Sequence, residues 1–181
     1  SDDDEYLELF NRGAGPVDLG GWRFTSGIDY RIPAGVTLAA GGYLVVAKNP
    51  VNLQATHPGL TAAITLGGYQ GTLSDRGERV ALARPDDVLS TNEVGVVTST
   101  RIFIDVAEVT YVDGGAWGIW SDGGGSSLEL TDVNADPLRG ANWADSDETA
   151  KGEWTSVSVS GRLDNGNDGF PPDQLQVTLQ G

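Results

Sequence analysis

The segment from Glu5 to Phe24, EYLELFNRGAGPVDLGGWRF, limits the possible folds of this chain more than any other segment. Leu7 and Leu9 alternate with Glu8, which is the two-residue period of a half-buried strand. NRGAGP then predicts a turn, and VDLGGWRF predicts a second extended run with a large aromatic anchor. We therefore expect the chain to begin with a strand, a turn and a second strand, none of which carries a catalytic residue.

The composition favours an all-β fold. The 181 residues include 26 glycines and 8 prolines, helix-period patterns are nearly absent, and this combination indicates a turn-rich chain. No apolar run is long enough to cross a bilayer, so we expect no membrane insertion.

In the middle of the chain, the order of apolar and polar residues predicts the strands and loops. The segment from Asn49 to Thr61 resembles a loop, and residues 84–101 resemble a polar insertion that hangs as a loop from one end of the fold. Beyond this insertion, the apolar positions change phase within one extended run, which predicts a β-bulge near Val106. Leu128 and Leu130 indicate a further strand.

Four blocks, in this order, resemble the lamin tail domain in the form carried by bacterial secreted and cell-surface proteins. They are ELFNRGAGPVDLGGWRF, IPAGVTLAAGGYLVVAKNP, LSDRGERVALARPDD and LTDVNADPLRGANWADS. The resemblance covers residues 4 to 147 and implies an immunoglobulin-like β-sandwich, with Trp22 and Trp143 in its interior. It also implies an accessory interaction or scaffold module within a larger protein, with no catalytic residues.

The last part of the chain does not fit this resemblance. After a predicted lamin tail domain at residues 1–147 and a polar linker at 148–153, residues 154–181 contain two alternating runs, TSVSVSG and QLQVTLQ. Two strands alone are marginally stable in water. They either pack on the sandwich, where the family's first strand is missing, or begin a truncated jelly-roll domain. The predicted fold class is thus an all-β immunoglobulin-like sandwich with a C-terminal two-strand extension.

Charge and residue types exclude several functions. With 26 acidic and 11 basic residues the net charge is −15, which argues against a nucleic-acid partner. The absence of cysteine excludes disulfides, thiolate metal sites and a cysteine nucleophile. The single histidine, His57, precedes Pro-Gly in a predicted loop, which argues against a serine hydrolase. We expect no enzymatic activity and no organic cofactor.

Calcium is the one metal that the sequence makes worth testing, because it prefers oxygen ligands from acidic loops. Two clusters have suitable residue types: Asp132, Asn134 and Asp136, and then Asp164, Asn165, Asn167 and Asp168. Neither has the bidentate glutamate of an EF-hand loop, and residues of these types are also typical of ordinary turns.

The function expected from these features is a non-catalytic structural or interaction module of a larger exported bacterial protein, in adhesion, spacing or docking. Its location would be extracellular or at the cell surface, and its partner a protein or a cell-surface glycan. Loops at residues 84–101 and 113–125 would form the contact surface. The alternative is a carbohydrate-binding module in which Trp117 and Trp120, both flanked by glycines, contact the sugar.

Overall fold

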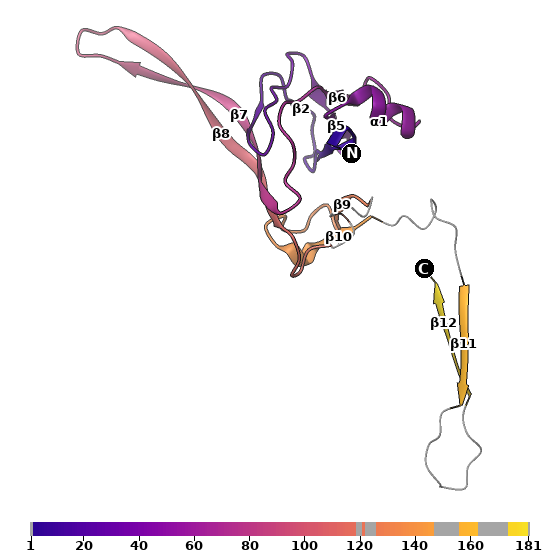
Figure 1. The fold of residues 1–181 in the computed structure, drawn as a ribbon. Helices are drawn as coiled ribbons and strands as arrows, with labels where there is room; N and C mark the ends of the chain where they lie inside the picture. Colours follow the sequence, from indigo (N-terminus) through magenta and orange to yellow (C-terminus); the bar gives the residue numbers. More distant parts are fainter. Residues whose placement is uncertain (1, 119–120, 122–125, 147–155, 163–173, 181) are drawn as a thin grey trace. The chain divides into compact units, whose positions relative to one another are not determined.

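The computed structural model describes residues 2–118, 121, 126–146, 156–162 and 174–180, and most of its regular secondary structure is β-strand (Figure 1). The chain divides into two compact units, Ser1–Asp145 and Ser146–Gly181. None of the helices in the described ranges has the length and apolar character needed to span a membrane.

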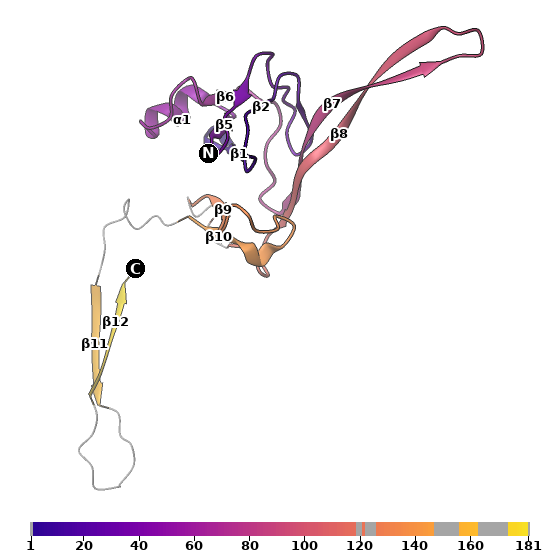
Figure 2. The ribbon, with the colours of Figure 1, turned by 180° about the vertical axis from the view of Figure 1, so that it is seen from behind.

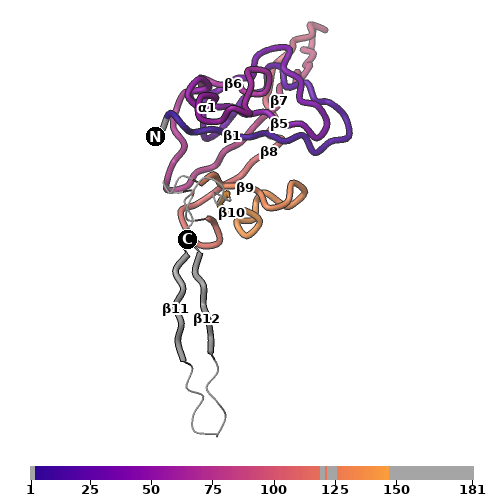
Figure 3. Tube along the Cα trace, turned by 90° about the vertical axis from the view of Figure 1, so that its right-hand side faces the viewer, coloured from indigo at the N-terminus to yellow at the C-terminus, as the bar shows by residue number. Residues whose placement is uncertain are grey.

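The first layer of the larger unit is a three-stranded sheet. Its strands are β1 (Tyr6–Phe10), β5 (Tyr43–Ala47) and β6 (Thr65–Gly67). Strand β5 lies in the middle, antiparallel to β1 and parallel to β6. The three strands lie side by side when the molecule is viewed from the side (Figure 3).

The second layer is also three-stranded, with β7 between two antiparallel neighbours. Its strands are β3 (Arg23–Ser26), β7 (Gly77–Thr91) and β8 (Val97–Val112). A short pair, β2 (Val17–Asp18) and β4 (Thr37–Leu38), adds a separate two-stranded ladder.

The core joins the two layers. Leu44 and Val46 come from the first sheet, and Phe24 and Leu82 from the second. The remaining buried members are Leu19, Ile28, Ile32, Leu38, Tyr69 and Val80. Since apolar side chains from two sheets form one interior, the expected all-β immunoglobulin-like sandwich is confirmed.

The opening segment folds differently from the sequence prediction in one respect. Its second extended run is divided by a turn at Gly21, which has a φ of +80°, into β2 and β3. The two halves pair with different partners, β2 with β4 and β3 with β7. The predicted strand, turn and strand are therefore a strand followed by two short strands in separate ladders.

The buried side chain of Asn11 holds the turn after β1 in one conformation. Its amide nitrogen donates to the carbonyl oxygens of Gly15 and Leu38, at 2.9 and 3.0 Å. Its side-chain oxygen accepts from the backbone N–H of Gly13 at 2.9 Å. These bonds replace bonds to water, so the residue is buried with its polar groups paired.

The prediction of a loop from Asn49 to Thr61 is wrong over its first half, which forms helix α1 (Pro50–Thr56). Asn49 caps the helix because its side chain accepts from the backbone N–H of Asn52, and Pro50 occupies an early position that needs no N–H donor. Leu53 packs on Val45 and Ala47. Strand β5 is therefore buried on both faces.

The predicted bulge near Val106 is confirmed. Leu82 lies opposite Ala107, and the next residue, Ala83, lies opposite Asp105, so Val106 has no partner on β7. This extra residue moves the apolar positions of β8 to the other parity.

The remaining described residues form two 3₁₀-helices and two short pairs of strands. The 3₁₀-helix η1 (Asp2–Asp4) precedes β1, and β9 (Leu128–Leu130) pairs with β10 (Trp143–Asp145), with the 3₁₀-helix η2 (Gly140–Asn142) immediately before β10. In the second unit, β11 (Ser156–Arg162) pairs with β12 (Gln174–Gln180) over seven residue pairs. Whether this hairpin packs on the sandwich or begins a further domain stays a prediction, as do the domain boundaries.

Candidate interaction surface

The candidate interaction surface of the first unit is the outer half of the β7–β8 hairpin, which we call the arm and define as residues 85–103. The pairing of β3 with β7 ends at Ala83, so the arm is a two-stranded ribbon. In the views of Figures 1 and 2 it extends well beyond the other strands of its unit.

The prediction of a loop at residues 84–101 is therefore wrong: the segment forms ordered strands. Cross-strand pairs hold them together. The Arg101 guanidinium donates to both oxygens of Asp87, at 2.9 and 2.7 Å, and the hydroxyls of Ser90 and Thr98 are 2.8 Å apart. The ion pair lowers the pKa of the Asp87 carboxyl.

The tip of the arm is a turn held by side-chain hydrogen bonds. The Asn92 side-chain oxygen accepts from the backbone N–H groups of Val94 and Val96, at 3.1 and 2.9 Å. Gly95 has a φ of +81°, which a residue with a side chain rarely adopts. The sequence TNEVGV contains a weaker form of this signal, an asparagine with a glycine three residues later between two alternating runs, which is typical of a longer hairpin loop.

The arm exposes many apolar side chains. Leu89 is 69 % exposed and Val94 is 81 % exposed. The other large apolar side chains exposed on the arm are Val88, Val96, Val97 and Ile102. The sequence pattern predicts a polar segment here, so the exposed apolar side chains are a finding of the structure. By the strand register, Leu89 and Val97 lie on one face of the ribbon and Val88 and Ile102 on the other, so both faces carry exposed apolar groups. Exposed apolar residues gathered on one element mark an interaction site more often than single scattered ones do.

The base of the arm has a different character, because charged groups gather there. Arg79 donates to the carboxylates of Asp105 and Glu108, and the Thr25 hydroxyl donates to Asp105 at 2.7 Å. Hydrogen bonds from Arg79 and Thr25 lower the pKa of the Asp105 carboxyl. Arg23 lies 3.7 Å above the ring centre of Phe103.

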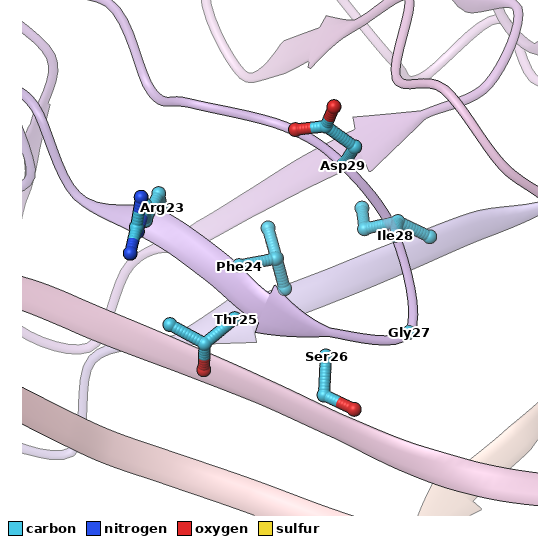
Figure 4. Close-up of a pocket in the computed structure, with 7 residues that line it drawn as sticks. All are labelled: Arg23, Phe24, Thr25, Ser26, Gly27, Ile28 and Asp29. Atoms are coloured by element: carbon cyan, nitrogen blue, oxygen red, sulfur yellow. The ribbon is translucent and has the colours of Figure 1, made fainter. Parts of the chain in front are cut away.

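A hollow of about 380 Å³ adjoins this base and is lined by residues 23–29. Figure 4 shows the chain turning back at Gly27, with Phe24 and Ile28 inside the turn. Both side chains are buried. Of its polar residues, Thr25 is engaged by Asp105 and Arg23 stacks on Phe103. The polar groups do not converge as a catalytic site requires.

Two partly buried carboxylates form a polar cluster on the other side of the core. Glu5 accepts from the Tyr69 hydroxyl and from the backbone N–H of Leu73, both at 3.0 Å. Glu78 accepts from the backbone N–H of Ser74 at 2.6 Å. Burial and the neighbouring Glu5 carboxylate raise the pKa of Tyr69. These hydrogen bonds hold the chain segment between β6 and β7 in place, so the burial of the two carboxylates has a structural explanation.

The first predicted ligand-contact residue, Trp117, packs against other residues. Its ring centre lies 6.0 Å from that of Trp143, with 33° between the ring planes, and it contacts Gly140 closely. The Trp143 indole N–H donates to the carbonyl of Pro137 at 2.9 Å. Trp143 thus pairs with Trp117 and is not part of the main core cluster, whereas Trp22 packs against that core as expected. Trp120 lies outside the described residues.

The first candidate calcium cluster is organised as turns. The carboxylates of Asp132 and Asp136 accept from the backbone N–H groups of Asn134 and Leu138, at 2.8 and 3.0 Å, and Asp136 also pairs with Arg139. Among the described residues, no three carboxylate or imidazole side chains gather as a metal site. Asp164, Asn165, Asn167 and Asp168 lie outside the described residues, and calcium binding stays a prediction.

Comparison with known proteins identifies the family. The model of the lamin tail domain matches residues 1–168. Comparisons with curated proteins and with solved structures each give no match. The matched range includes both sheets of the sandwich and the arm. The chain therefore belongs to the lamin tail domain family, a family of non-enzymatic immunoglobulin-like domains.

Proposed function

We propose that this chain is a non-catalytic interaction module of an exported bacterial protein, and that the arm is its contact surface. The module serves adhesion, spacing or docking, at the cell surface or outside the cell, and its partner is a protein or a surface glycan. The family supports an interaction role, and the observation that carries the proposal is the exposed apolar ribbon at residues 85–103.

Two physical reasons favour the arm over the rest of the first unit. The sandwich core lies between the two sheets, and the arm contributes none of the buried core residues, so the arm is available for binding without disruption of the core. Its backbone is also held as a paired ribbon, with cross-strand side-chain bonds between Asp87 and Arg101 and between Ser90 and Thr98, which reduces the entropy cost when a partner binds.

Site-specific crosslinking tests this proposal well because the chain contains no cysteine. A photo-crosslinker attached at V94C, at the arm tip, is compared with the same reagent at V51C, on α1. Val94 and Val51 are 81 % and 78 % exposed, so reagent access is matched. With intact cells of the source bacterium as the probe, we expect discrete adducts from V94C only. Equal adducts from both sites, or none from V94C, would contradict the arm as contact surface.

Export is tested separately with an antibody against the chain. Labelling of intact cells or of the culture medium is the expected result. Signal that appears only after cells are permeabilised would reject the proposed location, while the crosslinking result would still decide the role of the arm.

A further inference from the structure

We propose that β8 pairs, edge to edge and antiparallel, with β8 of a second copy of this chain, about a two-fold axis at Phe103. This inference rests on the proposed role of the arm as the interaction surface and names a second copy as the partner at its inner end, where β8 passes from the arm into the three-stranded sheet. It follows from the position of β8 in its sheet and from the order of residues along it.

Strand β8 is an edge strand. The order of the sheet is β3, β7, β8, and among the described strands β8 is hydrogen-bonded to β7 alone. It is 16 residues long, from Val97 to Val112. The backbone groups on its outer side are a template for a further strand. Ile102, Ile104 and Val106 are exposed along the same strand, and no proline interrupts it.

The sequence of this edge is complementary to itself when read antiparallel. Residues 101–105 are Arg-Ile-Phe-Ile-Asp. With the two-fold axis at Phe103, Arg101 of one copy lies opposite Asp105 of the other, and Ile102 lies opposite Ile104. Phe103 lies opposite its own equivalent. Both ends of the segment thus form pairs of opposite charge, and the centre forms three apolar pairs.

The register is specific. Moving the axis by one residue places Arg101 opposite Phe103 or opposite Ala107 and leaves Asp105 without a cationic partner across the pair. The faces also agree, because directly opposite residues of antiparallel strands share one face of the sheet. Arg101, Phe103 and Asp105 have one parity, and Ile102 and Ile104 have the other.

The groups involved are accessible in a single copy. The Arg101 and Asp105 side chains are 53 % and 38 % exposed. Within the chain, Arg101 already pairs with Asp87, and Asp105 pairs with Arg79. Pairing of two copies would therefore join these ion pairs into one row of alternating charge across four strands, and networks of this kind contribute more than isolated surface pairs.

Charge reversal at the two ends of the segment tests the pairing. R101D places two acidic side chains opposite each other in the homodimer, and D105R places two arginines opposite each other. Each variant alone is expected to raise the dimer dissociation constant at least about tenfold in sedimentation velocity. An equimolar mixture of the two variants restores both opposite-charge pairs, so we expect dimers to return.

The mixture separates the inference from damage within one chain. R101D and D105R each remove an ion pair inside the chain, and mixing does not repair those pairs. R139D is the matched control, because Arg139 also pairs with an aspartate, Asp136, but lies outside the sheet that contains β8. R139D is expected to dimerise as the wild type does.

Four outcomes would overturn the inference: a wild-type chain that stays monomeric up to about 1 mM, open-ended aggregates in place of dimers, single variants that still dimerise, or a mixture that does not. A bifunctional thiol reagent provides a check of register, because F103C is expected to crosslink between copies and S99C is not. Adducts of V94C with another protein would keep the proposed function even if the chain proves monomeric.

Discussion

At the scale of single residues, exposure separates positions that hold the fold from positions that are free to bind. Ile32 is 1 % exposed and belongs to the core between the two sheets, whereas Ile102 is 39 % exposed on the arm. The same chemical change at these two positions should therefore have very different effects on stability.

We predict that I32A lowers the free energy of unfolding by about 2–5 kcal/mol, because it leaves a cavity in a close-packed interior. I102A, the matched control, is expected to change it by less than about 0.5 kcal/mol. Urea unfolding of both variants measures the difference. Similar destabilisation at the two positions would mean that the arm contributes to the core.

The buried tyrosines predict an alkaline limit to stability. Tyr69 and Tyr111 both have raised pKa values, chiefly because burial disfavours the phenolate and next because Glu5 and Glu78 lie close to them. Since the folded state holds these protons more tightly than the unfolded state, the stabilisation is complete below the ordinary tyrosine pKa of about 10. It is lost as the pH rises above that value.

The expected slope above pH 10 is a decrease of up to about 1.4 kcal/mol per pH unit for each tyrosine. Urea unfolding at several pH values measures it. The double variant Y69F/Y111F should flatten the slope, although it also lowers stability at neutral pH because Glu5 and Glu78 are each deprived of a hydrogen bond. An equally steep slope in that variant would assign the effect to other groups.

At the scale of secondary-structure elements, the sequence predicted the strands well where apolar and polar residues alternate around one buried face. The bulge at Val106 was found because a phase change inside one strand needs an extra residue. The prediction failed where two faces are buried: β5 packs on α1 as well as on the core, and α1 is too short for its period to be visible. The sequence signal for α1 was its N-cap residue, Asn49, followed by Pro50.

Removal of this cap is expected to cost about 1 kcal/mol. In N49A the backbone N–H of Asn52 is left without its acceptor, whereas N49D keeps a side-chain oxygen at the same place. We therefore predict that N49A lowers the urea midpoint and that N49D stays close to the wild type. Equal effects of the two substitutions would contradict the capping role.

The sequence predicted where the arm lies in the chain, but not that it forms two paired strands. Its length and its place at one end of the fold follow from residues 84–101, but its order depends on pairs such as Asp87 with Arg101, which join residues 14 apart in the sequence. Such pairs become visible only when the turn at Gly95 is recognised. Exposure of its apolar residues cannot be read from alternation, because a ribbon without a covering layer has the same period as a buried strand.

At the scale of the whole molecule, calcium dependence is a further prediction. In the first candidate cluster, Asp132 and Asp136 already accept backbone N–H groups, so we expect no calcium to bind there. A binding site would stabilise the folded state by about 2.7 kcal/mol at a hundredfold excess of calcium over its dissociation constant. We therefore predict that calcium, compared with chelator, changes the unfolding temperature of D132A by the same amount as that of the wild type. A calcium shift in the wild type that D132A loses would contradict this prediction.

The central claim is that the sandwich folds without the arm, which leaves the arm free to bind. Replacing residues 85–103 with Asn-Gly joins Arg84 and Ile104, which already lie opposite each other, by a two-residue turn. This replacement removes the stacking of Arg23 on Phe103, which contributes about 0.5–1 kcal/mol at an exposed site.

Thermal unfolding of this shortened chain is the most direct measurement. The account predicts one cooperative transition within about 2–4 °C of the wild-type midpoint, as expected for a destabilisation near 1 kcal/mol. A variant that fails to fold, or whose midpoint falls by more than about 10 °C, would show that the arm is part of the structural core.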